Sequence, residues 1–429
     1  MRTKKNILFI SIIILCVLFS LFSFSKLKPV ENFTIIYISS SLLFVLICFM
    51  IFKIELHFKE VAALLIVGML IRISFINTQP IGSDDVYRYM WDGKVQANGI
   101  NPYTYTPNSN ALQTLHSELL PRLVNYPEFK TIYFPFSQWL FYAGYQISGE
   151  NVWGYKLLLL VFELLTILAL FLLIKKIGLP RKFILFYVLC PLPIIHFSID
   201  AHLDGFGLPL LLFSILFYLN QRKILSLIFL GLSLSIKPVG LLLIPIFFFN
   251  EKNILERIKI IIIPFIAFFI QFIPYIFTSN PFEMFFFYAK NWTFNGIVFN
   301  IINAFINNNQ TTRSFCAFLL VIALIPLFIS KKEVIFKFYY SILILFIFSP
   351  VVHPWYIAWL AILLPLYPRW SGFIFICLSS LTSITVLNYQ LTGKWNDYPL
   401  VLAAEYIPLF FCLGWELMKC KPKLGFIRK

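Results

Sequence analysis

Long apolar segments, separated by short polar stretches, follow one another along almost the whole chain. Most run for about 15 to 25 residues, the length that an α-helix needs to cross a hydrocarbon layer of about 30 Å. They lack the alternation of polar and apolar residues that a transmembrane β-barrel requires. With 60% hydrophobic and 13% charged residues, the chain has too little polar surface to enclose a soluble core. The sequence therefore predicts an all-α polytopic membrane protein.

Small clusters of Lys and Arg lie between the apolar segments, and they predict which helix ends face the cytoplasm. Residues 2–5 and the C-terminal tail are both basic, so we expect both termini in the cytoplasm. With residues 7–24, 33–52 and 61–76 as the first three spans, the loop that follows is external. Continued along the chain, the charge rule gives about 12 to 14 transmembrane helices in a single domain over residues 1–429.

The net charge of +16 does not indicate a nucleic-acid partner, because the basic residues are scattered and form no single stripe. The seven cysteines lie mostly within apolar segments and show no C-x-x-C pair or metal-ligand spacing. We therefore expect small buried thiols rather than a disulfide framework. No Gly-rich phosphate loop or Ser-His-Asp arrangement supports nucleotide hydrolysis or acyl transfer.

The predicted external loop, residues 77–152, contains an aromatic segment that is apolar enough to be a span. This segment, residues 133–147, is rich in Tyr, Phe and Trp and also carries Ser137 and Gln138. If it crossed the membrane, the basic residues 175–182 would face outward, against the charge rule. Aromatic side chains with a polar edge suit the headgroup region. We therefore expect an interfacial helix here.

Three carboxylates and several aromatic residues directly follow the third predicted span. The run begins with Gly82-Ser-Asp84-Asp85-Val-Tyr-Arg. Ionisable groups at a membrane boundary are costly to desolvate, so such a cluster predicts a functional site. A carboxylate placed there can accept the proton of an acceptor hydroxyl. The alternative is a solvated turn that caps a helix starting near Val86.

Two further polar groups fall at external ends of predicted helices. His202 and Asp204 begin one helix, where they either contact a sugar or phosphate or simply cap the helix. Lys237 precedes Pro238 and interrupts the apolar segment 224–249, which predicts a broken helix. A cation in such a place either binds an anion such as phosphate or extends its ammonium to the interface.

The run His353-Pro-Trp355-Tyr356 begins another predicted helix. Its rings either stack on a sugar or isoprenoid or belong to an interfacial aromatic belt. Arg88 is a second candidate for binding phosphate. Asp92, one helical turn later, either lines the same site or pairs with Arg88.

Four short motifs resemble those of the polyprenyl-phosphate-mannose-dependent mannosyltransferases, members of the GT-C superfamily of integral-membrane glycosyltransferases. They are S-x-D-V-Y-x-Y with G-x-N-P-Y in the first external loop, H-x-D at 202–204, Lys-Pro at 237–238 and H-P-W-Y at 353–356, of which only the first is specific. The resemblance implies a GT-C fold, with Asp85 as catalytic base and Asp84 as second choice. The substrate-binding residues that we expect are Tyr87, Arg88, Asp92, Asn101, Tyr103, His202, Asp204, Lys237, His353, Trp355 and Tyr356.

The resemblance also implies a reaction. A hexose, with mannose favoured, passes from a polyprenyl-phosphate donor to a hydroxyl of a glycan, lipid or other acceptor, and Asp85 deprotonates the acceptor in one inverting displacement. The expected location is a bacterial inner membrane, with the site on the external, periplasmic face. The motifs require no cofactor, but the doubled acid and the extra Asp200 leave open a divalent cation.

Two alternatives remain at this point. A transporter or flippase of lipid-linked saccharides would share the fold size and the interrupted helix, and inverted-repeat symmetry, which the sequence lacks, would favour it. The second alternative is a structural membrane factor whose catalytic residues no longer function. The presence together of Asp85, Lys237 and His353 argues against that second alternative.

Overall fold

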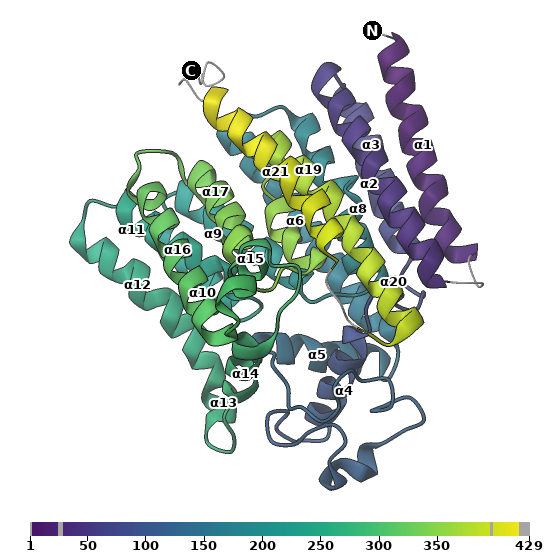
Figure 1. Cartoon of the computed structure of the whole chain (residues 1–429), viewed down its shortest axis with the longest axis vertical. Coiled ribbons are helices and arrows are strands. Elements are labelled where there is room, and N and C mark those ends of the chain that lie inside the picture. The colour runs from purple at the N-terminus through teal and green to yellow at the C-terminus, as the bar shows by residue number, and fades with distance from the viewer. Residues whose placement is uncertain (1, 25–28, 395–397, 420–429) are drawn as a thin grey trace.

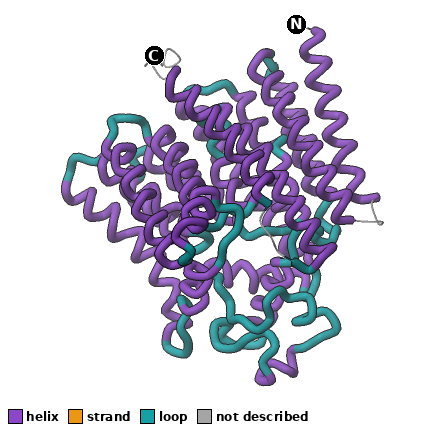
Figure 2. The backbone as a smooth tube through the Cα atoms, in the orientation of Figure 1, coloured by secondary structure: helices purple, strands orange, loops and turns teal. Residues whose placement is uncertain are grey.

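The computed structural model describes residues 2–24, 29–394 and 398–419, and within these ranges the chain forms helices and no strand (Figure 2). The predicted all-α class is therefore confirmed. The cysteines in these ranges are free, as predicted. Cys420 lies outside the described residues.

The first part of the chain combines long helices with a loop region that contains short ones. Its elements are α1 (Arg2–Phe24), α2 (Pro29–Lys53), α3 (Phe58–Ser74), α4 (Asp85–Ala97), η1 (Asn110–Leu115), α5 (Pro135–Ser148), α6 (Val152–Ile177), η2 (Arg181–Ile184), α7 (Leu185–Val188), α8 (Pro191–Pro193), η3 (Ile194–Ile199), α9 (Asp204–Leu219), α10 (Lys223–Leu234), η4 (Pro238–Leu242) and α11 (Leu243–Asn250).

The remaining part continues in the same way. Its elements are α12 (Ile254–Phe269), η5 (Ile270–Phe272), α13 (Ile273–Ile276), α14 (Glu283–Asn291), α15 (Ile297–Ile306), α16 (Asn309–Ile329), α17 (Val334–Phe348), η6 (Pro354–Ile357), α18 (Ala358–Ala361), α19 (Trp370–Leu378), η7 (Ser379–Thr382), α20 (Ser383–Thr392) and α21 (Pro399–Lys419).

Among the described residues, 7 helices are long and apolar enough to cross a membrane, which makes the chain a multi-pass integral membrane protein. The pair Arg181–Val188 and Pro191–Ile199, bent by 44°, adds an eighth if it is one span. Several segments expected to cross are shorter apolar helices, such as Asp204–Leu219 and Val334–Phe348. Because these fall short of a full membrane thickness, the count of about 12 to 14 spans stays a prediction.

Apolar side chains on the outer helices point away from the protein, as lipid-facing residues do. Ile266 on α12, Phe318 and Ile325 on α16, and Phe411 on α21 are all exposed. Exposed apolar area of this extent is typical of a surface covered by membrane or partner rather than by water.

The two ends of the molecule differ. Helix α1 begins and α21 finishes at one end, whereas α4, α5 and the loops around them lie at the other (Figure 1). At the first end Lys5 pairs with Glu60 at 2.8 Å, and Lys182 Nζ donates to Ile54 O at 2.6 Å. The start of α1 and the end of α21 are therefore separated from the first large loop, as the charge rule predicts for the two ends of the chain.

An ion pair joins α3 and α6 in the interior. Arg72 Nε lies 2.8 Å from Glu163 Oε2, and the two side chains are 0% and 1% exposed. Arg72 Nη1 also donates to the carbonyl oxygens of Gly68 and Val188, and Tyr187 donates its hydroxyl to Glu163. Buried charges need such partners, so this network fixes α3 against α6 next to the loop region.

The loop region is built on the packing of α4 against α5. A Cβ at Gly93 would lie 2.4 Å from Phe141 O, so only glycine lets the two helices approach this closely. Helix α5 coincides with the expected interfacial segment and has 14 residues, too few to cross a membrane. Its position along the interface stays a prediction.

The chain breaks between α10 and η4, as the sequence predicts. Lys237 has extended backbone angles (φ −156°, ψ 138°), and Pro238 starts the next turn. Proline has no N–H to donate to the preceding turn, which explains why α10 cannot continue through it.

Candidate active site

Four segments distant in the sequence meet near the loop end of the helices. They are the start of α4, the stretch between η3 and α9, the break before η4 and the turn that leads into η6. Contacts between them involve Asp85 with His202, His202 with Trp355, and Lys237 with Tyr356. The structure therefore gathers polar groups that the sequence analysis considered separately.

Asp84 and Asp85 share one hydrogen-bond donor. Asp85 is the first residue of α4 and Asp84 precedes it, so both carboxylates face the positive end of the helix dipole. The side-chain amide of Asn125 donates to Asp85 Oδ1 at 2.7 Å and to Asp84 Oδ1 at 3.0 Å. On its other side, Asp85 Oδ2 lies 3.4 Å from His202 Nδ1. This geometry holds Asp85 between an amide and an imidazole.

The two carboxylates differ in their readiness to lose a proton. Loss of solvation and the neighbouring Asp85 charge raise the pKa of Asp84 to about 6. Loss of solvation also acts on Asp85, but His202 and Asn125 outweigh it and lower the pKa of that carboxyl below its ordinary value. Asp85 therefore stays ionised at a lower pH than Asp84, which takes up a proton as the pH falls through about 6.

Rings from three segments stack in one continuous column. The His202 and Trp355 rings lie 3.8 Å apart at 16°, and the Trp355 and His353 rings lie 4.3 Å apart at 6°. Phe294 stacks on the far face of His353, with ring centroids 4.6 Å apart. The column begins beside Asp85, so it forms an aromatic wall next to the carboxylate.

Lys237 is held by an anion and an aromatic ring. Its Nζ lies 2.6 Å from Asp204 Oδ1 and 3.0 Å from the centroid of the Tyr356 ring. Trp359 Nε1 donates to the same Asp204 oxygen at 2.7 Å. Tyr356 in turn shares a hydrogen bond with Tyr288, 3.0 Å between the hydroxyl oxygens. The cation is fixed in place, with 18% of its side chain exposed.

Arg88 and Asp92 bind each other inside the loop region. Arg88 Nε lies 2.9 Å from Asp92 Oδ1, and Arg88 Nη1 donates to Phe129 O at 2.9 Å. Asp92 also accepts from Gln138 Nε2 at 2.9 Å. Both side chains are buried, and their pairing is one of the two alternatives that the sequence allowed. The bond from Gln138 to Asp92 fastens α4 to α5. A contact of either residue with substrate stays a prediction.

Asn101 and Tyr103 lie apart from the Asp85 cluster, whereas Tyr87, two residues after Asp85, directs its hydroxyl to another partner. Tyr87 donates its hydroxyl to Gln79 Oε1 at 3.3 Å. Asn101 Nδ2 donates to Tyr275 O at 3.2 Å, and Tyr103 donates its hydroxyl to Tyr133 O at 2.7 Å. The last two therefore tie the loop region to α13 and to the start of α5, and the structure does not bring them to the carboxylates.

Sequence reasoning did not find Asn125, Trp359, Tyr288 or His196. Asn125 is one of many asparagines in the chain, and Trp359 and Tyr288 read as ordinary membrane aromatics. His196 lies in an apolar run, although its spacing of four residues from Asp200 places both on one face of a helix and is a usable signal. In the structure His196 Nδ1 lies 3.6 Å from Asp200 Oδ2.

Two family models match the chain. Residues 18–250 match the family described as alpha-(1->6)-mannopyranosyltransferase, N-terminal domain. Residues 296–413 match the MptB C-terminal domain. A search of curated proteins gave no match. The first region contributes Asp85, His202 and Lys237 to the site, and the second contributes the rings of Trp355 and Tyr356.

Proposed function

Because the chain belongs to the alpha-(1->6)-mannopyranosyltransferase family and is thus a membrane mannosyltransferase, we propose that it uses a polyprenyl-phosphate-mannose donor and a hydroxyl acceptor on the external face. Family membership places the chain among transferases rather than among the transporters or flippases that the sequence also allowed. The observation that carries the proposal is Asp85, an ionised carboxylate held by Asn125 and His202 beside the aromatic column.

Asp85 acts as the general base. It accepts the proton of the acceptor hydroxyl while that oxygen forms a bond to the anomeric carbon of mannose. The bond from the anomeric carbon to the phosphate oxygen breaks in the same step, and the phosphate leaves with the electron pair. One displacement from the face opposite the phosphate inverts the configuration at that carbon. Asp84 is the second candidate, because it is Asp85 that lies beside His202 and the aromatic column.

Lys237 supplies positive charge for the departing phosphate. Its ammonium is oriented by Asp204 and the Tyr356 ring, and a cation fixed in this way needs little reorganisation during the reaction. Charge that develops on the phosphate oxygen is stabilised by such a group. Both faces of the His353 and Trp355 rings are covered within the aromatic column, so a sugar or the first isoprene unit would contact the edges of these rings.

A groove between α15 and α21 supports a lipid-borne donor. It is lined by Ile297, Asn300, Ile301, Pro399, Leu402, Ala403, Tyr406, Ile407 and Phe410. The groove begins three residues after Phe294, which stacks on His353. An isoprenoid chain in this apolar groove would have its phosphate end directed toward the aromatic column.

The distribution of basic residues supports an external site. Lys5 and Lys182 lie at the end where α1 begins and α21 finishes, and Lys53 ends α2 there (Figure 1). Basic residues favour the cytoplasmic side, so the opposite end, with Asp85, is the external one. Donors dissolved in the cytoplasm would not reach a site on that side, whereas a lipid-linked donor does so from within the bilayer.

The proposal is tested with the purified protein in lipid nanodiscs, supplied with either synthetic polyprenyl-phosphate-mannose or GDP-mannose and a membrane glycan extract. We expect transfer from the lipid-linked donor alone, and a loss of about 10²–10⁴-fold in Asp85→Asn. Asp84→Asn, the matched control one residue away, keeps transfer within about tenfold of the wild type. Comparing the anomeric configuration of donor and product by NMR tests inversion. Transfer from GDP-mannose, or full activity in Asp85→Asn, would contradict the proposal.

A further inference from the structure

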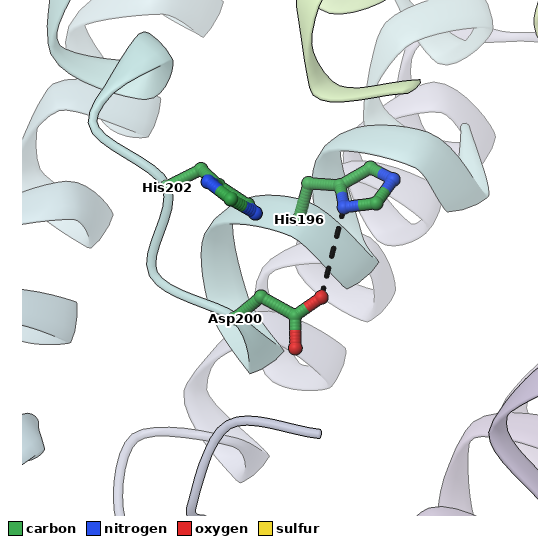
Figure 3. Close-up of side chains that lie close together, drawn as sticks. All are labelled: His196, Asp200 and His202. Carbon is green, nitrogen blue, oxygen red and sulfur yellow. Dashed lines mark ion pairs between the residues drawn. The ribbon is translucent and has the colours of Figure 1, made fainter. Parts of the chain in front are cut away.

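His196, Asp200 and His202 form a buried cluster that the proposed reaction does not use directly. One ligand-type atom from each lies within 4.8 Å of the others, and all three residues are buried. In Figure 3 the His202 ring directs a nitrogen toward the space between His196 and Asp200. Two imidazoles and one carboxylate are the ligand set that zinc-class divalent ions prefer.

Each of the three side chains directs one atom to the common centre, and His196 and Asp200 are also held from outside by hydrogen bonds. Buried atoms without a hydrogen-bond partner include His196 Nδ1, Asp200 Oδ2 and both ring nitrogens of His202. On the outer side, His196 Nε2 pairs with Tyr37 OH at 3.1 Å, and Asp200 Oδ1 accepts from the Ile81 and Gly82 amides at 3.0 and 2.8 Å. His202 Nδ1 faces Asp85, so its Nε2 is the nitrogen left for the centre.

This arrangement differs from an ordinary buried histidine–aspartate pair. A direct hydrogen bond would bring His196 Nδ1 within about 3.0 Å of Asp200 Oδ2. The observed separation of 3.6 Å is close to the spacing of about 3.4 Å between two ligands that each lie about 2.1 Å from a tetrahedral zinc ion. Outer partners that fix each ligand are a feature of metal sites.

The backbone is distorted where the cluster forms. Residues Ile194–Ile199 form a π-helical turn, and Ala201, between Asp200 and His202, has a positive φ of 59°. Both conformations are unfavourable without a compensating interaction and are enriched at functional sites. A Cβ at Gly82 would lie 2.7 Å from Asp200 Oδ2, so glycine keeps the space beside this oxygen open.

We propose that His196, Asp200 and His202 bind one zinc-class divalent ion, which positions Asp85 through His202. With the ion on Nε2, the remaining proton of the His202 ring lies on Nδ1 and faces Asp85 Oδ2. Asp200 at the same time holds the backbone of Ile81 and Gly82, which lead into Asp84. The positioning role rests on the proposed function of Asp85, whereas ion binding does not.

Ion binding is measured with Co²⁺ as the probe. The full chain, purified with a histidine-free affinity tag and stripped with a chelator, is titrated while the visible absorption of tetrahedral Co²⁺ is recorded. We expect one Co²⁺ per chain, displaced by one Zn²⁺, with the metal content checked by mass spectrometry. His57→Ala, which removes an exposed histidine outside the cluster, should give the wild-type titration.

The ligand variants are Asp200→Asn and His196→Gln. In Asp200→Asn the side-chain amide oxygen can still accept from the Ile81 and Gly82 amides, so this variant keeps the local hydrogen bonds while it removes the anionic ligand. We expect at least tenfold weaker Co²⁺ binding in both variants, and no rise of Tm on adding Zn²⁺, in contrast to the wild type. The variants are folded if their elution volume, and their Tm without metal, equal those of the wild type. No Co²⁺ spectrum in the wild type, or an unchanged spectrum in both variants, would overturn the site.

The positioning role has its own readout. Chelation of the wild type should lower kcat about 10- to 100-fold with donor KM unchanged, and Zn²⁺ should restore it. In Asp200→Asn, kcat is low and Zn²⁺ does not restore it. A wild type that binds Co²⁺ but transfers mannose equally well after chelation would overturn the positioning role alone. A wild type that binds Co²⁺ but never transfers mannose would count against the proposed function instead.

Discussion

The ammonium of Lys237 lies 2.6 Å from Asp204 Oδ1, so the cation at the helix break is paired within the protein. Its carboxylate partner is 1% exposed and has Trp359 as a second donor. Lys237 therefore has two separable tasks, neutralising a buried anion and, in our proposal, stabilising the leaving phosphate.

The two tasks of Lys237 respond differently to substitution. Lys237→Met leaves the Asp204 charge buried and should lower stability by about 3–5 kcal/mol. Adding Asp204→Asn should restore most of that stability, while transfer stays at least about 10²-fold down because the phosphate has lost its cation. Thermal unfolding and transfer assays of the single and double variants measure both effects. Lys130→Met, which breaks the more exposed pair with Glu283, is the control and should change little. Recovery of transfer in the double variant would mean that the lysine has only a structural task.

The pH dependence of transfer identifies the base. The pKa of Asp84 is raised to about 6, so Asp84 gains a proton as the pH falls through 6. The pKa of Asp85 is lowered, so Asp85 stays ionised over the same interval. If Asp85 is the base, the rate of chemistry should be nearly constant from about pH 7 to about pH 5, in the wild type and in Asp84→Asn alike. Single-turnover rates across this range provide the measurement, and a fall centred near pH 6 in the wild type together with loss of transfer in Asp84→Asn would identify Asp84 instead.

The aromatic column predicts a graded response at Trp355. This ring stacks on His202 on one face and on His353 on the other, so Trp355→Ala removes two ring contacts worth about 0.5–1.5 kcal/mol each. We expect a rise in donor KM and about 10- to 100-fold lower kcat/KM, with Trp355→Phe intermediate. Trp415→Ala, which removes a 46% exposed ring on α21, is the matched control and should keep kinetics close to wild type. Equal losses in the alanine and phenylalanine variants would argue that the indole N–H matters, not the stack.

The interior pair between α3 and α6 predicts a stability effect without a role in chemistry. Glu163→Gln leaves the Arg72 guanidinium buried beside a neutral partner and should cost about 3–5 kcal/mol. Glu283→Gln, in a pair whose side chains are 32% and 51% exposed, should cost about 1 kcal/mol or less. Midpoints of thermal unfolding in detergent compare the two, and a similar shift for both variants would contradict the prediction.

Much of the architecture could be predicted from local sequence. Apolar segments of membrane length indicated the helical class, and Pro238 after a lysine marked the break that the structure has. Helix number was harder to predict, because hydropathy does not distinguish a full span from a short or bent helix buried among others. Residues Pro191–Ile199 show the difficulty, since an apolar run there turns by 44° against its predecessor.

The residues of the candidate site could be predicted only where they lie close together in the sequence. Asp84 and Asp85 stand together after a span, and His202 and Asp204 share one short motif, so their clustering was visible. Asn125 is separated by 41 and 40 residues from the two carboxylates that it binds. Trp359 reaches Asp204 across 155 residues. Contacts of this range depend on tertiary packing, and a single sequence carries no local signal for them.

The hydrogen bond from Trp359 to Asp204 has a consequence for how such a chain can be recombined. It joins the region matched over residues 18–250 to the region matched over 296–413. The stacking of Trp355 on His202 and the contact of Lys237 with the Tyr356 ring join the same two regions. Neither half holds a complete set of partners for the lysine or the histidine. A chimera that exchanges one half with a relative would therefore keep its catalytic residues and still lose their alignment, unless the facing aromatic residues were exchanged with it.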